Sequence, residues 1–388
     1  MRHFRKWALV ISGLLIAGSS EAATYWVNPS ALGQHCIDSA TDPRASSSSQ
    51  TIAQGLACLA SGDTLFIRSG TYNEAIDYNQ IPTGGGTWST ATRVLAATGN
   101  SVILQPVSGA YEGSAVIAGY DQSYIIFGGE DDADYGMKID ASNISNMGIR
   151  IIDNAGLPHH IRVQNTEIYG SPNSCTGDAK SSFNEWIHNQ IHNCGTSSFE
   201  SPLTGGHGIY VAGSENDLVE GNEVYEVGGT SGAFPTGYGI HVYHPGSNNN
   251  IIRNNYVHDN VYGGIIISSG DNNVAYNNII VGNPIYGLQI GTGTTTNNKA
   301  YHNTIYDNAS CIDITSGIGA VVRNNLCLAN AVNTVQDFGS GSTIDHNYST
   351  TDPAGTVVDA AGGDFRLVAG SGAIDQGIAL DSRYNVDY

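Results

Sequence analysis

Residues 238–242, Tyr-Gly-Ile-His-Val, are one copy of a short motif that recurs along the chain and decides the fold. The motif has the form x-Gly-aliphatic-z-aliphatic, in which z varies from copy to copy. Copies occupy residues 147–151, 207–211, 238–242, 263–267 and 286–290, and residues 310–314 carry cysteine in the glycine position. Because aliphatic residues alternate with period two, each copy predicts a β-strand with one buried face.

A second pattern places an asparagine in a polar turn between two aliphatic segments. Its asparagines are Asn222, Asn255, Asn278, Asn303, Asn325 and Asn347, and from Asn255 onward they are separated by 23, 25, 22 and 22 residues. A constant step brings like residues to the same place in successive coils, so stacked asparagines can satisfy turn carbonyls at one corner. We therefore predict an all-β, single-stranded right-handed parallel β-helix with three sheets per coil, in which neighbouring coils lie about 4.8 Å apart. Residues 51–59 predict a short amphipathic helix that caps the N-terminal end.

The start of the chain has the parts of a secretory signal peptide. A basic head with Arg2, Arg5 and Lys6 precedes an apolar run at 7–17 and small residues up to Ala23. We expect residues 1–23 to be the signal and residues 24–388 to be the β-helix, with 24–110 forming the N-terminal cap and first coils. The protein is then secreted, either extracellular or periplasmic.

Charge and cysteine content narrow the choice of partners. The predicted mature chain keeps 12 Lys and Arg against 34 Asp and Glu, a net charge of about −22. This excess argues against nucleic acid and anionic membranes, and no segment is long enough to insert in a bilayer. The six cysteines form sequence-near pairs, which favour disulfides Cys36–Cys58, Cys175–Cys194 and Cys311–Cys327 among 15 possible connectivities.

Several segments resemble the secreted pectate-lyase-like β-helix proteins. Residues 24–27 and 62–72 look like the N-terminal region of that group, and residues 364–367 and 370–375 resemble its C-terminal ending. The resemblance covers nearly the whole predicted mature chain and implies a polysaccharide ligand in an elongated cleft. It does not imply one reaction, because the superfamily contains lyases, hydrolases, epimerases and proteins without known catalysis.

Most candidate site residues come from the z positions, from the residues two places after them, which we also expect on the outer face of the first sheet, or from positions next to these. Polar members of this outer column concentrate between residues 150 and 243, beside Ser/Gly/Thr/Pro-rich insertions at 170–182, 195–206 and 227–237. Long loops beside one part of a solenoid usually build a binding face. The catalytic candidates are His241, Tyr210, Arg150, Lys180 and His207, and the candidates for substrate binding are Tyr243, Tyr238, Gln289 and His244.

These residue types suit β-elimination on a uronate. That reaction needs a base at C5, a proton donor to the leaving O4 and a positive charge against the carboxylate. We expect His241 or Lys180 as the base, Tyr210 or Tyr243 as the donor, and Arg150 against the carboxylate. His207 is either a further catalytic group or a histidine at a strand start bonded to loop backbone. Tyr238 points either to the groove or inward.

Other chemistries stay open at this stage. A glycoside hydrolase would need two carboxyl groups about 5–10 Å apart, for which Asp178, Glu215 and Asp217 are candidates, and a noncatalytic carbohydrate-binding protein would use the tyrosines alone. We expect no metal site and no certain cofactor. Residues 130–134 offer acidic ligands for Ca²⁺, against the alternative of a solvated acidic corner. We expect a monomer.

Overall fold

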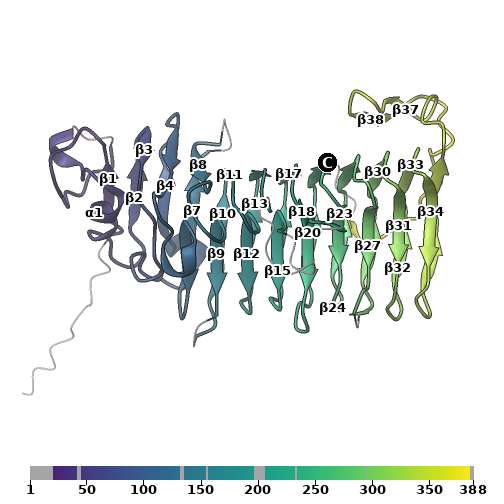
Figure 1. The fold of residues 1–388 in the computed structure, drawn as a ribbon, viewed down its shortest axis with the longest axis horizontal. Helices are drawn as coiled ribbons and strands as arrows, with labels where there is room; N and C mark the ends of the chain where they lie inside the picture. The colour runs from purple at the N-terminus through teal and green to yellow at the C-terminus, as the bar shows by residue number, and fades with distance from the viewer. Residues whose placement is uncertain are drawn as a thin grey trace, which may run out of the picture.

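The computed structural model describes residues 21–41, 45–131, 135–153, 156–195, 206–231, 234–293 and 295–384. The described chain winds into a single column of stacked coils that runs from the purple N-terminal end to the yellow C-terminal end (Figure 1). Most of the predicted signal segment, 1–20, lies outside the described residues, as do residues 196–205 of the insertion at 195–206. The predicted parallel β-helix with three sheets per coil is confirmed.

Three long parallel sheets form the sides of the column, and each coil adds one strand to each sheet. Sheet A has twelve strands: β1 (Thr24–Val27), β2 (Thr64–Ile67), β4 (Thr92–Ala96), β7 (Ser123–Gly129), β10 (His159–Gln164), β13 (Glu185–Ile187), β16 (Leu218–Glu220), β21 (Ile251–Arg253), β25 (Val274–Tyr276), β29 (Lys299–Tyr301), β32 (Val321–Arg323) and β35 (Thr343–Asp345). Sheet B has eleven: β3 (Gly70–Tyr72), β5 (Val102–Leu104), β8 (Met137–Asp140), β11 (Thr166–Tyr169), β14 (Gln190–His192), β17 (Glu223–Tyr225), β22 (Tyr256–His258), β26 (Ile279–Val281), β30 (Thr304–Tyr306), β33 (Leu326–Leu328) and β36 (Tyr348–Thr350).

Sheet C contains the x-Gly-aliphatic-z-aliphatic motifs. Its nine strands are β6 (Val116–Gly119), β9 (Ile149–Ile152), β12 (Thr176–Ala179), β15 (Ile209–Ala212), β20 (Tyr238–Tyr243), β23 (Gly263–Ile267), β27 (Tyr286–Ile290), β31 (Ser310–Ile314) and β34 (Val332–Asp337). The regular strand β12 lies within residues 170–182, so it corrects the interpretation of that whole segment as an insertion. Its inward positions hold Thr176 and Asp178, polar residues that hide the usual aliphatic signal.

Short elements cover the ends and corners. The predicted cap is α1 (Ile52–Leu56), whose Thr51 and Gln54 form a reciprocal capping box and whose Ile52 and Leu56 are buried. Two-stranded pairs are β18 (Gly229–Ser231) with β19 (Phe234–Thr236), β24 (Gly270–Asp271) with β28 (Thr295–Thr296), and β37 (Val357–Asp359) with β38 (Asp364–Leu367). Short 3₁₀ turns are η1 (Ala45–Ser47), η2 (Trp88–Thr90), η3 (Tyr111–Gly113) and η4 (Ser382–Tyr384).

The interior is one continuous aliphatic core with asparagine ladders at all three corners, not only at the one that the sequence predicted. The predicted column at the A–B corner is joined by a second ladder at the B–C corner and a third at the C–A corner. Within a ladder, each side-chain oxygen accepts the backbone N–H of the preceding coil, as Asn278 does for Asn255 at 3.1 Å. These bonds satisfy corner groups that would otherwise be buried without partners.

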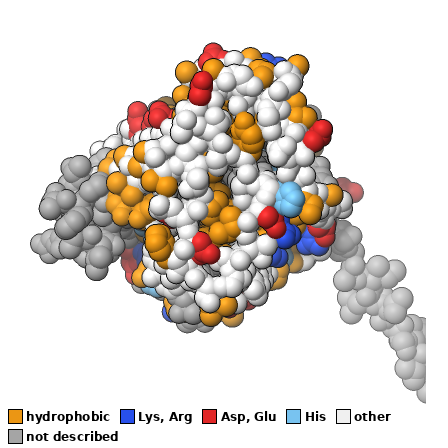
Figure 2. All heavy atoms as spheres, turned by 90° about the vertical axis from the view of Figure 1, so that its right-hand side faces the viewer, with side chains coloured by type: hydrophobic (Ala, Val, Ile, Leu, Met, Phe, Trp, Pro, Cys, Tyr) orange, Lys and Arg blue, Asp and Glu red, His pale blue; other side chains and the backbone are white. Residues whose placement is uncertain are grey.

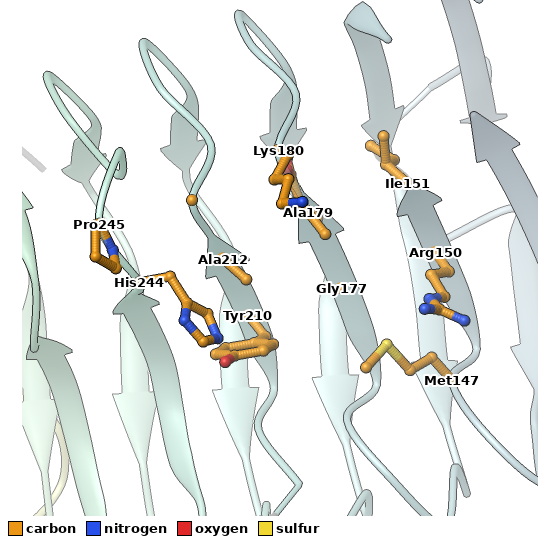
Figure 3. A pocket seen from close by; sticks show the side chains of 12 residues that line it. Met147, Arg150, Ile151, Gly177, Ala179, Lys180, Tyr210, Ala212, His244 and Pro245 are labelled. Atoms are coloured by element: carbon orange, nitrogen blue, oxygen red, sulfur yellow. The ribbon is translucent and has the colours of Figure 1, made fainter. Parts of the chain in front are cut away.

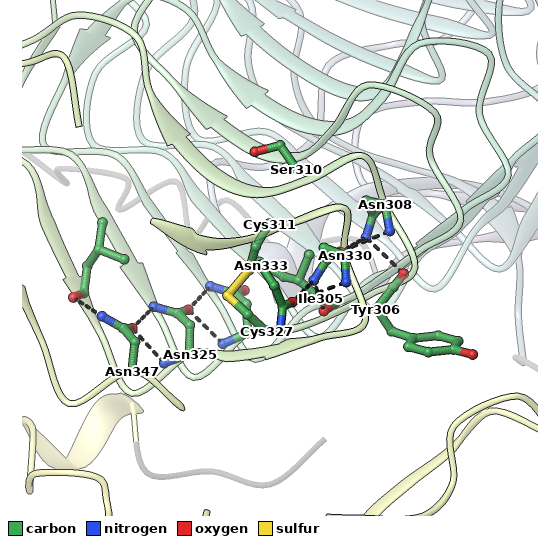
Figure 4. The surroundings of a disulfide bond; sticks show 12 residues. Ile305, Tyr306, Asn308, Ser310, Cys311, Asn325, Cys327, Asn330, Asn333 and Asn347 are labelled. Atoms are coloured by element: carbon green, nitrogen blue, oxygen red, sulfur yellow. Dashed lines mark hydrogen bonds between the residues drawn. A yellow bond between two sulfur atoms is a disulfide. The ribbon is translucent and has the colours of Figure 1, made fainter. Parts of the chain in front are cut away.

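The three predicted disulfides are confirmed: Cys36–Cys58, Cys175–Cys194 and Cys311–Cys327. Cys311 and Cys327 are fully buried, and their disulfide joins sheet C to sheet B inside the column, between two of the ladders (Figure 4).

The two ends of the column differ. Figure 2 views the molecule from the end at which β34 lies and shows hydrophobic side chains within that face. Phe338 is 70% exposed and Ile344 is 39% exposed there.

Of the helices in the described residues, none has the length and apolarity that crossing a membrane requires.

Candidate functional site

The outer face of sheet C carries the predicted column of candidate residues. In β20, Ile240 and Val242 are fully buried in the core, and His241 between them lies on the outer side. The strand register aligns Arg150, Gly177, Tyr210 and His241 on four successive coils. The parity that the sequence predicted is therefore confirmed for this column.

One position of this outer column is a glycine, Gly177. Gly177 stands in the column between Arg150 and Tyr210, and a Cβ atom there would lie 2.4 Å from the sulfur of Met147. Gly177 and Met147 line a hollow of about 430 Å³, together with Arg150, Lys180, Tyr210 and His244 (Figure 3). We call it the cationic groove.

Two basic side chains reach the cationic groove from adjacent coils. Arg150, on β9, forms an ion pair with Glu112, whose side chain is 42% exposed. Lys180 follows β12, its side chain is 73% exposed, and its Nζ lies 4.0 Å from Asp153. Both pairs border solvent, where ion pairs contribute little stability, so an anionic ligand can compete for the cations.

Histidines 207 and 241 form a directed chain of hydrogen bonds beside this groove. The Tyr238 backbone N–H donates to His207 Nδ1 at 3.2 Å, which leaves the proton of a neutral His207 on Nε2. That Nε2 donates to His241 Nδ1 at 2.9 Å, so His241 carries its proton on Nε2 and donates to Ser268 Oγ at 2.8 Å. The chain runs from backbone through both imidazoles to Ser268.

Burial keeps both imidazoles neutral. It lowers the pKa of His207 to about 3, and burial together with His207 and His244 holds the pKa of His241 well below its usual range. Both ring nitrogens of His241 are already engaged, and its side chain is 9% exposed. It accepts a proton only if the bond from His207 breaks first.

Tyr210 is the aromatic residue at the centre of the groove. Its ring centroid lies 5.0 Å from that of His207 and 5.4 Å from that of His241. Burial and the neighbouring Tyr243 raise the pKa of Tyr210 to about 12. The hydroxyl therefore stays protonated at neutral pH, as a proton donor requires.

The predicted binding residues divide into an accessible and a covered pair. Tyr243 is 37% exposed, and its ring lies 4.2 Å from that of the exposed His244. Tyr238 lies on the outer side beside His241, which answers the question of its direction, and its hydroxyl donates to Gln289 Oε1 at 3.1 Å. Gln289 is only 3% exposed. Of the four, Tyr243 and His244 are the better placed to contact a ligand.

A second hollow adjoins the cationic groove on the far side of the His244–Pro245 turn. It measures about 480 Å³ and is bordered by Tyr243, Ser269, Asp271 and Thr292 as well as by that turn. Among its described lining residues, Asp271 alone carries a formal charge. We call it the distal hollow.

Sequence reasoning missed a polar cluster inside the column, directly beneath the cationic groove. Asp178 is 1% exposed and accepts hydrogen bonds from Ser181, Ser214 and Asn184. Asp217 Oδ1 accepts the Asn184 backbone N–H at 2.7 Å, while its buried Oδ2 has no partner among the described residues. Burial and Asp178 raise the pKa of Asp217 well above its usual range.

The signal for this cluster was present in the spacing. Asn184, Asp217, Asn250, Asn273 and Asn298 repeat at the same intervals as Asn189, Asn222, Asn255, Asn278 and Asn303. Asp217 is thus an acid in an asparagine ladder. Asp178 and Asp217 lie in the interior, and of the carboxyl candidates for hydrolysis only Glu215 is exposed.

Within the described ranges, no three His, Cys, Asp or Glu side chains are grouped so as to hold a metal ion. Of the acidic segment 130–134, Glu130 accepts bonds from the backbone and hydroxyl of Thr98, and residues 132–134 lie outside the described residues. The Ca²⁺ alternative therefore stays a prediction.

The fold and the groove define the class: a right-handed parallel β-helix protein with a hollowed outer sheet. A family model described as a right handed beta helix region matches residues 197–350. No curated protein sequence matches the chain.

Comparison with solved structures found matches at low sequence identity. Pectate lyase Pel9A is 15% identical with a TM-score of 0.62, and the match covers 96% of this chain and 94% of that one. An alginate lyase from Paenibacillus sp. str. FPU-7 is 15% identical over 75% of this chain and 96% of that one, with a TM-score of 0.49. The periplasmic alginate epimerase AlgG is 14% identical over 69% of this chain and 62% of that one, with a TM-score of 0.43. The likeness to Pel9A confirms the resemblance to pectate-lyase-like proteins at the level of the fold.

Proposed function

We propose that this protein is a secreted polysaccharide lyase that cleaves a uronate-containing polysaccharide by β-elimination in the cationic groove. The observation that carries the proposal is the placement of Arg150 and Lys180 on adjacent coils, around a hollow that also holds the Tyr210 hydroxyl. In a chain with a net charge of −20, two cations at one hollow favour an anionic ligand. The similar fold of pectate lyase Pel9A supports a lyase, and the three disulfides support secretion, because disulfides persist mainly in oxidising compartments.

The proposed roles follow from the hydrogen bonds. Arg150 exchanges Glu112 for the sugar carboxylate and stabilises the charge that develops on it after C5 deprotonation. Lys180 gives up a proton to solvent after the sugar has bound, and its neutral amine then removes the C5 proton; the electrons form the C4–C5 double bond and the C4–O4 bond breaks. Tyr210 donates its proton to O4. His241 and His207 are positioning residues, because their ring nitrogens are already committed to each other and to Ser268.

Hydrolysis has less support at this groove. Asp178 is the one carboxylate among the described lining residues of the groove, and it is hydrogen-bonded within the interior. Glu112 and Asp153, outside that lining, are each beside a cation. A retaining or inverting hydrolase needs two carboxyl groups that face the scissile bond.

The test incubates the protein with a panel of uronate polysaccharides and measures two products. β-Elimination creates an unsaturated uronate, which absorbs in the ultraviolet, together with a new reducing end. We expect both signals to rise together in the wild type and to fall by about 100-fold or more in Tyr210→Phe and Lys180→Met. Tyr256→Phe and Lys299→Met, on sheets B and A, are the matched controls and should keep wild-type rates.

Two results would contradict the proposal. Reducing ends without ultraviolet absorbance would identify a hydrolase. If the protein binds a polysaccharide but neither reducing ends nor ultraviolet absorbance rise on any polymer, it is a noncatalytic carbohydrate-binding protein.

A further inference from the structure

Charge is distributed unevenly along the sheet C face, and this asymmetry bears on the substrate. The cationic groove and the distal hollow both border the His244–Pro245 turn. Together they extend from β9 to the loop after β27, six coils that span about 24 Å at the spacing of parallel strands. A chain lying along this face therefore places several sugar residues over both hollows.

The two hollows offer opposite electrostatic environments. Arg150 and Lys180 lie at the first, and among the described residues that line the second no lysine or arginine is present. Asp271 borders the distal hollow, and no ion pair or side-chain hydrogen bond of Asp271 is found in the described part of the chain. Its negative charge repels a carboxylate at this position and is not neutralised by a neighbour.

Neutral groups around Asp271 suit an uncharged sugar. Ser269 and Thr292 supply hydroxyls, Asn248 an amide, and Tyr243 a partly exposed ring that can pack against an apolar sugar face. A homopolymer of uronates would carry a carboxylate over Asp271 whenever it filled both hollows.

We infer that the substrate is a heteropolysaccharide: a uronate occupies the cationic groove, and a neutral or N-acetylated sugar occupies the distal hollow, where Asp271 excludes a second uronate. This inference rests on the proposed function for the identity of the groove ligand. It adds the substrate class and a residue that determines specificity.

The test measures binding and turnover separately. Calorimetric titration compares two probes of equal length: an oligogalacturonate, and an oligosaccharide in which galacturonate alternates with rhamnose. Each titration is run once with a chelator and once with added Ca²⁺. A second alternating probe, glucuronate with N-acetylglucosamine, covers the N-acetylated case. We expect an alternating probe to bind about tenfold or more tightly than the homopolymer, a difference that Asp271→Asn reduces and Asp271→Lys reverses. Asp307→Asn, an exposed aspartate beyond β30, removes the same charge far from the groove and should change nothing.

The outcomes separate the two proposals. Equal or tighter binding of the homopolymer that does not respond to Asp271→Asn overturns the heteropolymer inference. Homopolymer binding that requires added Ca²⁺ and weakens in Asp271→Asn also overturns it, because Asp271 would then bind a bridging cation. The alternating probe can also bind more tightly in a way that depends on Asp271 while no unsaturated product forms. That result supports the heteropolymer inference and contradicts only the lyase reaction.

Discussion

Asp217 shows how one residue inside a repeat can differ chemically from its neighbours. In the next coil, Asn250 uses its Nδ2 to donate to the Ser214 carbonyl at 3.0 Å. The equivalent Oδ2 of Asp217 has no proton to donate unless the carboxyl is protonated. Burial and Asp178 both favour that protonated form, which explains the raised pKa.

We predict that Asp217→Asn increases the free energy of unfolding at pH 7 by more than about 1 kcal/mol. The folded-state pKa of Asp217 is above its unfolded value near 4. The stability that the Asp217 carboxyl contributes to the wild type is therefore fully present below about pH 4 and is lost as the pH rises through the folded-state pKa. The advantage of the variant should therefore grow with pH. Denaturant unfolding across a pH series measures it.

Asp178→Asn is the control of opposite sign. Asp178 accepts three donors, and an amide would turn an N–H group toward one of them, so this variant should lose stability. If Asp217→Asn is less stable than the wild type at pH 7, or if its stability varies with pH as that of the wild type does, Asp217 is not protonated in the folded protein.

For the pair His207 and His241 we predict that stability depends on pH in the direction opposite to that of Asp217. The folded-state pKa values of His207 and His241 are below the unfolded value near 6.5, so the stability that they contribute is present above that pH and is lost as the pH falls through their folded-state pKa values. A double variant, His207→Ala with His241→Ala, should be less stable at pH 7 but lose less stability on acidification. Parallel unfolding curves for wild type and variant would contradict the buried neutral pair.

At the scale of the strand, the glycine column of sheet C has a packing reason. A Cβ atom on Gly208, Gly239, Gly264 or Gly287 would lie 2.4 Å from a methyl group of Val224, Val257, Ile280 or Ile305, respectively, on sheet B. In the following coil Cys311 replaces the glycine and Cys327 replaces the aliphatic residue, and a disulfide fills the shared space.

This packing predicts which cysteine replacements the fold tolerates. Cys311→Gly with Cys327→Ile reproduces the Gly287–Ile305 pair of the adjacent coil. It should fold with less stability than the disulfide-bonded wild type, by about 2–4 kcal/mol. The reversed pair, Cys311→Ile with Cys327→Gly, has identical composition but places a branched side chain where no Cβ fits, so it should be less stable still. Equal melting temperatures of the two variants would contradict the complementary column.

The asparagine ladders give a second prediction at this scale. Asn255 is fully buried and bonds Val219 O, Asn278 Oδ1 and two groups of Asn222. Asn255→Ala leaves several of these without partners and should cost about 3 kcal/mol of unfolding free energy. Asn79→Ala, at an exposed turn, should change it by less than about 0.5 kcal/mol. A small loss for Asn255→Ala would mean that water replaces the ladder bonds.

The sequence predicted those features whose residue pattern recurs in successive coils. The strands, the A–B ladder, the disulfides and the outward direction of His241 follow from periodicity, because each coil repeats the same environment. The C–A ladder was hidden by Asp217, and strand β12 by the buried Asp178. The chain from His207 to Ser268 and the hollow above Gly177 depend on neighbours in adjacent coils, which the sequence order of one strand does not contain.

At the scale of the whole molecule, the described chain is a column that carries its candidate site on one side. Sheet C combines the hollow above Gly177, the cations and the accessible tyrosine on adjacent coils. The regular coils on either side provide a rigid frame for these residues. This arrangement suits a long polymer laid along the column axis.

The most direct test of the account is a crystal structure of Tyr210→Phe with a bound uronate oligosaccharide. The account predicts a sugar carboxylate within hydrogen-bonding distance of Arg150, with C5 facing Lys180 and the chain directed toward Asp271. An oligosaccharide bound on sheet A or sheet B, or one on sheet C with its carboxylates turned away from Arg150 and Lys180, would contradict it.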